Sequence, residues 1–160
     1  MLDAVNKRIV EELQSDARLS MAALGRRVNL SAPAVAERVQ RLEREGVIRG
    51  YRADVDPVAL GYSVSAVIRV APATRQLEKI RELARESPEV VECHRITGED
   101  CFFMKLYVRD VEHLEETIDV FTPYGQTTTS IMQSSPVLAR AVRLPSADDR
   151  LDNVADLRPV

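Results

Sequence analysis

One stretch of the chain decides the fold: residues 20–46 read SMAALGRRVNLSAPAVAERVQRLEREG. Ser20 and Ser31 each precede a run with helical apolar spacing, and serine is a preferred helix N-cap. Asn29 stands between the two runs, and asparagine tolerates the left-handed conformation that commonly follows a helix end. The stretch therefore predicts two short helices joined by a tight turn, which is a helix-turn-helix pattern.

The second of these helices has two distinct faces. Pro33 fits its first turn, where a missing amide costs little. One face is apolar and consists of Val35, Val39 and Leu42. At about 100° per residue, Ala34, Arg38 and Arg41 gather on a different face. Small side chains allow approach to the major groove, and guanidinium groups reach phosphates or guanine edges. A generic surface helix would show the same stripe, so both interpretations stay open.

The flanks of this stretch extend the same unit. Asp3 is an expected N-cap for a first helix whose apolar stripe is Val5, Ile9 and Leu13. After the third helix, residues 47–55 alternate loosely and predict a small strand or hairpin. We expect a helix-turn-helix domain over 1–56 and a connector over 57–62.

The second half changes to an alternation of strands and helices. The expected order is strand, helix, strand, strand, helix, strand, which is the ferredoxin-like βαββαβ arrangement, so the fold class is α+β. The pattern predicts strands at 63–70, 90–97 and 101–108, helices near 77–84 and 111–121, and a strand-rich segment at 127–142. This domain is expected over 63–144, followed by an acidic tail over 145–160.

The third expected strand has apolar residues on both of its faces. Phe102, Met104, Leu106 and Val108 share one face. On the side away from the helices lie Cys101, Phe103, Lys105 and Tyr107, and Val67 of the first strand joins them. Apolar residues on both faces imply burial on both sides of a sheet. We therefore expect a homodimer formed sheet to sheet, and two-fold symmetry also suits a helix-turn-helix that reads two half-sites.

Composition and charge limit the class of protein. The chain has 160 residues, 45% hydrophobic and 29% charged, which fits one domain or two small ones. No apolar run approaches the roughly 20 residues of a membrane span, so no membrane partner is expected. Two cysteines and an N-terminus without an apolar signal core favour the cytoplasm.

The net charge of −3 at first disfavours a nucleic-acid partner. Within residues 26–52, however, seven arginines stand against three glutamates, which gives +4 locally. A near-neutral total can hide one basic face, and that face is what a phosphate backbone meets. A solvated charged surface remains the alternative on charge alone.

Catalytic and metal chemistry lack a signal. His94 and His113 have no neighbours at metal-ligand spacing, and no phosphate-binding glycine loop or nucleophile elbow occurs. Cys93 and Cys101 are not expected opposite each other, so no disulfide is predicted. We expect no enzyme, no cofactor, no catalytic residue and no metal site.

The chain resembles the Lrp/AsnC, or feast/famine, transcription regulators over about residues 2–144. The first half carries the resemblance in Asp16-Ala17-Arg18-Leu19-Ser20, Leu30-Ser31, Arg38-Val39, Leu42-Glu43 and Gly46-Val47-Ile48. The second half carries it in Val91-Glu92-Cys93-His94 and Thr97-Gly98-Glu99-Asp100. The resemblance implies a sequence-specific reader of double-stranded DNA, winged-helix-like, joined to a domain that dimerises, assembles further to an octamer and binds an amino acid or related metabolite.

Carried over by residue, the resemblance makes the helix from Ser31 to Glu45 the recognition helix. Positions expected near DNA are Arg26, Arg27, Ser31, Ala32, Pro33, Ala34, Arg38, Arg41, Arg49 and Arg52. The expected effector site consists of Thr97, Gly98, Glu99, Asp100, Cys101, Thr127, Thr128 and Thr129. Many relatives place an acid three residues after the turn glycine, where this chain has Cys101, so a plain polar turn remains the alternative.

Two alternative functions remain open. Some siroheme decarboxylases resemble the same two-domain family, with His94 as a proton donor and Arg95 as a carboxylate clamp, but such an enzyme has no use for the arginines between Arg26 and Arg41. A sensor or assembly module without DNA function is the third hypothesis. In the favoured mechanism, a metabolite bound between sheet domains shifts the oligomer and so couples nutrient state to transcription.

Overall fold

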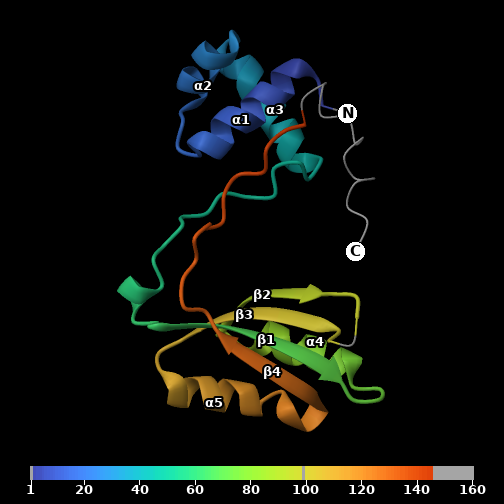
Figure 1. The fold of residues 1–160 in the computed structure, drawn as a ribbon. Coiled ribbons are helices and arrows are strands. Elements are labelled where there is room, and N and C mark those ends of the chain that lie inside the picture. Colours follow the sequence, from blue (N-terminus) through green and yellow to red (C-terminus); the bar gives the residue numbers. More distant parts are fainter. Residues whose placement is uncertain (1, 99, 146–160) are drawn as a thin grey trace, which may run out of the picture. The chain divides into compact units, whose positions relative to one another are not determined.

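The computed structural model describes residues 2–98 and 100–145 (Figure 1). The chain divides into two compact units. Among the described residues, the helical unit contains 2–53 and 137–145, and the sheet unit contains Asp54–Pro136. Glu99, part of the expected effector turn, lies outside the described residues. So does the expected acidic tail, except for Pro145.

The helical unit consists of three short helices, α1 (Ala4–Ser15), α2 (Met21–Val28) and α3 (Ala32–Arg44). Their expected caps are confirmed, because the side chains of Asp3, Ser20 and Ser31 accept hydrogen bonds from backbone N–H groups of the first turns. Asn29 adopts the left-handed conformation with φ 58°, as the sequence predicts. The helix-turn-helix is therefore formed by local signals that the sequence carries openly.

The core of this unit is made by the predicted apolar stripes. The buried residues are Ile9, Leu13, Leu24, Val28, Val35, Val39 and Leu42. Each helix contributes its one apolar face, as expected for amphipathic helices that pack around a common centre. The opposite face of α3 stays outside this core.

One glycine sets the distance between α2 and α3. A Cβ built on Gly25 would lie 2.6 Å from the backbone oxygen of Leu30, closer than real side chains come to such an atom. The Gly25 carbonyl accepts the Leu30 N–H at 2.9 Å across the same turn. The close approach of the two helices thus requires a residue without a side chain.

The strand or hairpin predicted over 47–55 does not form. Gly46 has φ 70°, and the N–H groups of Val47 and Ile48 then bond back to the Leu42 carbonyl. The chain continues in an extended form with no strand in residues 47–63. A strand needs a partner for its backbone groups, and this segment has none among the described residues.

The sheet unit contains four strands and two helices: β1 (Val64–Pro72), α4 (Leu77–Glu86), β2 (Val90–Arg95), β3 (Phe102–Val108), α5 (Val111–Asp119) and β4 (Gly125–Ile131). Two short 3₁₀ turns, η1 (Val58–Leu60) and η2 (Thr122–Tyr124), precede β1 and β4. All neighbouring strands are antiparallel in the order β2-β3-β1-β4. The predicted ferredoxin-like order is confirmed.

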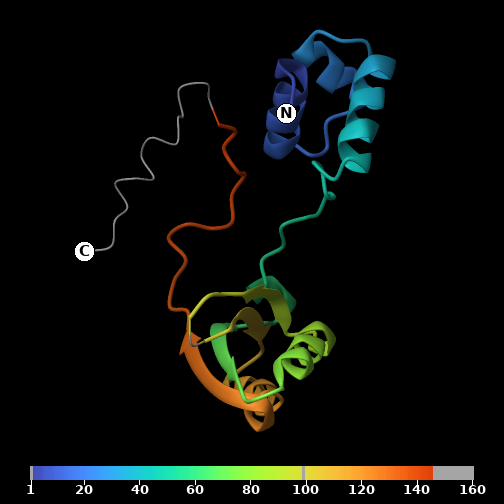
Figure 2. The same ribbon diagram turned by 90° about the vertical axis from the view of Figure 1, so that its right-hand side faces the viewer.

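Both helices lie on one face of this sheet, as Figure 2 shows for the lower part of the picture. The core beneath them includes Ile68, Ile80, Phe102, Met104 and Phe121. β3 alternates strictly between buried and half-buried residues, which is the pattern of a sheet covered on one side. The other face of the sheet carries neither α4 nor α5, the two helices of this unit.

The last strand is shorter than predicted. β4 ends at Ile131, and only Met132 continues its pairing, with a hydrogen bond to the Ser65 carbonyl. β1 begins at Val64, so residues after Met132 have no neighbour to pair with. The expected strand character of 137–142 is therefore absent from the structure. Separately, no helix of the described residues is long and apolar enough to cross a membrane.

Candidate DNA interface and effector site

The residues predicted to face DNA from α3 differ in their exposure. Val35 is fully buried, whereas Ser31, Pro33 and Arg41 are exposed and Ala34 is half-buried. Ala32 and Arg38 are half-buried as well. The start of the helix thus offers small side chains around its exposed N-terminal turn, with arginines farther along, as groove entry requires.

Arg38 is turned toward the start of α1. Its Nη1 atom lies 2.7 Å from Asp3 Oδ2 and 3.0 Å from Asn6 Oδ1. The hydrogen bond from the Asn6 backbone N–H and then that from Arg38 lower the pKa of the Asp3 carboxyl. Asp3 therefore caps α1 and joins α1 to α3 through one carboxylate.

Two more of the predicted DNA-binding arginines have carboxylate partners. Arg27 Nη1 lies 2.7 Å from Glu12 Oε2, and Arg41 Nε lies 2.7 Å from Glu45 Oε1 one turn along the helix. Exposed pairs of this kind contribute about 0–1 kcal/mol. A phosphate oxygen can replace such a carboxylate at little cost, so these arginines remain available to a polyanion.

The remaining predicted arginines lie exposed on α2 and on the segment after α3. Arg26, Arg49 and Arg52 make no ion pair with any residue that the structure describes. The segment that carries Arg49 and Arg52 is tied to α3, because Tyr51 Oη donates to Glu43 Oε1 at 3.0 Å. Burial, followed by this contact with a carboxylate, raises the pKa of Tyr51.

The expected effector turn joins β2 to β3. The Ile96 N–H bonds to the Cys101 carbonyl, which closes the hairpin, and Gly98 has φ 111°, a value that favours glycine. Asp100 Oδ2 lies 3.2 Å from Arg69 Nη1 of β1. The turn therefore holds a carboxylate next to a guanidinium, with Thr97 and Cys101 beside them in sequence.

The three predicted threonines of β4 do not all face this turn. Thr128 pairs with Arg69, whereas Thr127 pairs with Val70 and Thr129 with Ile68. Directly paired residues point to the same face of a sheet. Because Ile68 and Val70 are fully buried under the helices, Thr127 and Thr129 belong to that covered face. Only Thr128 shares the open face with Arg69.

The open face of the sheet is the one that the sequence predicts. Val67, Phe103, Lys105 and Tyr107 are half-buried there, without a helix over them. Lys105 Nζ lies 5.1 Å from the centre of the Tyr107 ring, and the hydrogen bond with Tyr107 raises the pKa of Lys105. Large apolar and amphipathic side chains left half-buried are typical of an interaction face.

The two histidines have separate surroundings. His113 Nε2 lies 3.1 Å from Glu89 Oε1, and His113 Nδ1 faces the Arg109 N–H at 3.3 Å, which ties α5 to the chain before β2. His94 stands 3.6 Å from Glu92 on β2. Within the described residues, no three His, Cys, Asp or Glu side chains come together as a metal site would need.

Sequence reasoning missed two residues and one contact that build these sites. Gly25 stood in a helical pattern, where a glycine signals a close packing contact. Arg69 lies two residues after Val67 in the same alternation and so belongs to the same face. The pairing of Asp3 with Arg38 joins positions 35 residues apart, and no local pattern reports it.

Comparisons with known proteins cover both units. The AsnC-type helix-turn-helix domain matches residues 2–43, and the Lrp/AsnC ligand binding domain matches residues 65–142. The HTH-type transcriptional regulator LrpC of Bacillus subtilis is 37% identical over 133 residues, which is 83% of this chain and 92% of LrpC. The solved structure of LrpC has a TM-score of 0.81 at 35% identity and covers 87% of this chain and 99% of its own.

Two further relatives bear on the ligand side. The proline dehydrogenase transcriptional activator of Rhodobacter capsulatus is 38% identical over 114 residues, covering 69% of this chain and 74% of the activator. A transcriptional regulator from Neisseria meningitidis, solved as a complex with L-Met, has a TM-score of 0.82 at 26% identity and covers 89% of this chain and 97% of its own.

The comparisons give no support to the decarboxylase alternative, since these relatives are named as regulators. An ordered helix-turn-helix and a ligand-binding domain occur here in the same order as in LrpC. The chain belongs to the Lrp/AsnC family and is a DNA-binding transcriptional regulator with an effector-binding domain, not an enzyme.

Proposed function

We propose that this regulator reads double-stranded DNA with α3, responds to a free amino acid bound at the β2–β3 turn, and works as a homodimer that assembles further, up to an octamer. Residues 1–56 take the DNA-reading role, and residues 63–144 take effector binding and assembly. The observation that carries the proposal is the outward face of α3, where small residues and arginines stand over a fully formed core.

The DNA-binding surface divides into two kinds of contact. Side chains at the start of α3, from Ser31 to Ala34, are short enough to let the helix approach base edges. Arginines around it, including Arg26 and Arg52, suit phosphate oxygens. Arg27, Arg38 and Arg41 would exchange their carboxylate partners for phosphates, and the weakness of exposed ion pairs makes that exchange feasible.

The effector site is proposed from opposite charges at one turn. A free amino acid carries a carboxylate and an ammonium group, and Arg69 and Asp100 offer the matching charges within 3.2 Å of each other. Thr128 adds a hydroxyl on the same face. The relative from Neisseria meningitidis was solved with L-Met, which supports an amino acid as the class of effector.

The open sheet face is the proposed dimer interface. Its half-buried residues Val67, Phe103 and Tyr107 lie on the face opposite α4 and α5, and two sheets packed face to face would bury them. A two-fold dimer would present two copies of α3 to two half-sites. We place this activity in the cytoplasm, because two cysteines cannot form a disulfide framework and chromosomal DNA is the proposed partner.

The direct test begins with the DNA. Chain expressed in its host is crosslinked and pulled down, and the enriched duplexes are used to measure dissociation constants at one fixed salt concentration, with and without each of the twenty amino acids. We expect discrete enriched sites and a changed constant or oligomer mass with at least one amino acid. Uniform recovery of the whole chromosome would contradict sequence-specific reading, and indifference to all twenty would contradict the effector class.

A further inference from the structure

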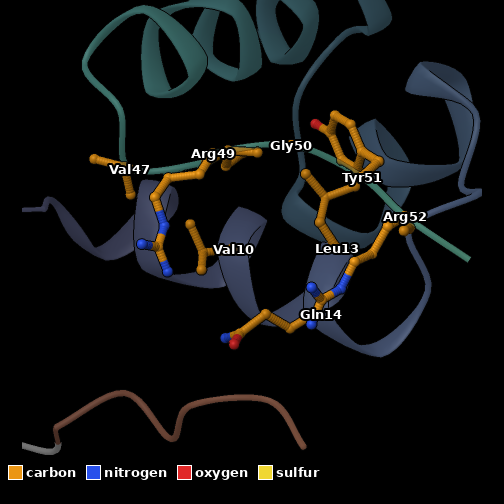
Figure 3. A pocket seen from close by; sticks show the side chains of 10 residues that line it. Val10, Leu13, Gln14, Val47, Arg49, Gly50, Tyr51 and Arg52 are labelled. Carbon is orange, nitrogen blue, oxygen red and sulfur yellow. The ribbon is translucent and has the colours of Figure 1, made fainter. Parts of the chain in front are cut away.

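A groove of about 730 Å³ opens in the helical unit between α1 and the extended segment after α3 (Figure 3). The groove has an apolar side and a basic, polar side. The apolar side is formed by Val10, Leu13 and Val47, and the basic, polar side by Gln14, Arg49 and Arg52. Figure 3 shows the two arginine side chains reaching from the extended segment over α1. The lining therefore suits a segment that is both apolar and acidic.

The end of the described chain passes this groove. Gln14 Nε2 donates to the Val142 carbonyl at 3.2 Å, and the described residues 137–145 belong to the same compact unit as the groove. The last described residue, Pro145, follows Val142 by three positions. At about 3.3 Å per extended residue, the next fifteen residues have ample reach into a groove that their own chain already contacts.

Those fifteen residues, 146–160, have the complementary chemistry. They read SADDRLDNVADLRPV, with four aspartates against two arginines. Leu151, Val154 and Leu157 recur at every third position between the charged residues. The match to the Lrp/AsnC ligand binding domain ends at residue 142, so this segment lies outside the matched domain.

We propose that residues 146–160 bind in the groove of their own chain, with Leu151, Val154 and Leu157 against its apolar side and the aspartates against Arg49 and Arg52. The same two arginines are assigned to DNA phosphates, so the segment competes with DNA and lowers its affinity. This consequence rests on the proposed function, whereas the docking itself does not. The regulator thus carries an acidic segment that restrains its own DNA-binding unit.

The docking is tested without DNA. The chain contains no tryptophan, so Val154→Trp introduces a single emission probe into the full chain. We expect emission at shorter wavelength and weak quenching by acrylamide. Adding Arg49→Ser with Arg52→Ser should shift the emission to longer wavelength and increase the quenching. The matched control, Arg18→Ser with Arg44→Ser, removes the same charge outside the groove and should leave the emission protected.

The same probe decides between intrachain and interchain binding. If the chain carrying both Val154→Trp and the groove substitutions is refolded with an excess of unmodified chain, its emission should stay exposed. Recovery of protected emission would assign the groove to the segment of another copy and overturn the proposal. Exposed emission in the Val154→Trp chain with an intact groove would overturn it as well.

The competition is tested by a variant that keeps the charge. Leu151→Ser, Val154→Ser and Leu157→Ser together should raise DNA affinity about threefold to tenfold, because two exposed charge pairs are released and each contributes a factor of up to about five. Unchanged affinity would overturn the competition. A chain that bound no duplex at all would contradict the proposed function alone, and the tryptophan emission would still decide the docking.

Discussion

Replacing Gly25 by alanine tests how the recognition helix is positioned. The new Cβ would lie 2.6 Å from the Leu30 oxygen, and that atom belongs to the backbone and cannot swing aside. It must retreat beyond 3.0 Å, which moves the turn that carries α3. Overpacking of this kind costs about 1–3 kcal/mol, whereas the helix propensity of alanine returns up to about 1 kcal/mol. We expect Gly25→Ala to destabilise the helical unit by about 1–2 kcal/mol.

The assay combines urea unfolding, followed by circular dichroism at the helix band, with DNA affinity measured where every variant is folded. Ala22→Gly is the matched control, because Ala22 is exposed on the same helix and its change costs about 1 kcal/mol through propensity alone. We expect the control to lose stability but keep its DNA affinity, and Gly25→Ala to lose both. Stabilisation of the chain by Gly25→Ala, as propensity alone would give, would refute the close-contact reasoning.

Three further predictions follow from the ion pair at α1, the effector turn and the open sheet face. Because hydrogen bonds lower the pKa of folded Asp3 below its ordinary 3.8, its contribution to stability is complete above that value and is lost as the pH falls through the lower folded pKa; Asp3→Asn should remove this part of the acid slope in urea midpoints measured from pH 5 to 3, and an identical slope would argue against it. Arg69→Ala and Asp100→Asn should each raise, by about tenfold or more, the effector concentration needed for a given rise in melting temperature, since each removes one charge partner. Lys79→Ala, which breaks a similar exposed pair on α4, should leave that concentration unchanged. Phe103→Glu should reduce the oligomer mass measured by light scattering, because it places a carboxylate on the half-buried open face; an unchanged mass would contradict the sheet-to-sheet dimer.

Much of the fold could be predicted because its signals are local. Ser20 and Ser31 cap helix starts with their side chains, and Asn29 ends α2 with its own left-handed backbone. The helix-turn-helix therefore needed no long-range information. The alternation of Phe102 to Val108 likewise identified the face of β3 that the helices cover. Both features, the helix ends and the two-residue alternation of the strand, depend only on residues close together in the sequence.

The predictions that were wrong concern features that depend on partners far away in the sequence. Residues 47–55 and 137–142 have strand-like composition, but strand formation requires a neighbour, and β1 begins too late to pair with the second segment. The register of β4 against β1 decided that Thr128, and not Thr127 or Thr129, accompanies Arg69. A one-residue change of register would reverse that assignment, so composition alone could not give it.

The candidate DNA surface shows the same division. The exposure of Arg41 follows from the helical period, whereas the contact of Arg38 with Asp3 arises only when α1 packs on α3. Arg38 therefore has a structural role in the unbound chain beside its proposed role at DNA. A loss of affinity in Arg38→Ala would mix both roles, which makes Arg41 the cleaner position to test.

The central claim is that the outward face of α3 reads DNA, and the affinity of Arg41→Ala for a duplex recovered from the chromosome tests it most directly. Arg81→Ala is the matched control, because Arg81 also forms an exposed pair with a glutamate on its own helix, but on α4. At equal salt and unchanged oligomer mass, we predict that Arg41→Ala binds about tenfold more weakly or worse and that Arg81→Ala binds like the unmodified chain. Equal affinities for the Arg41→Ala, Arg81→Ala and unmodified chains would contradict the account.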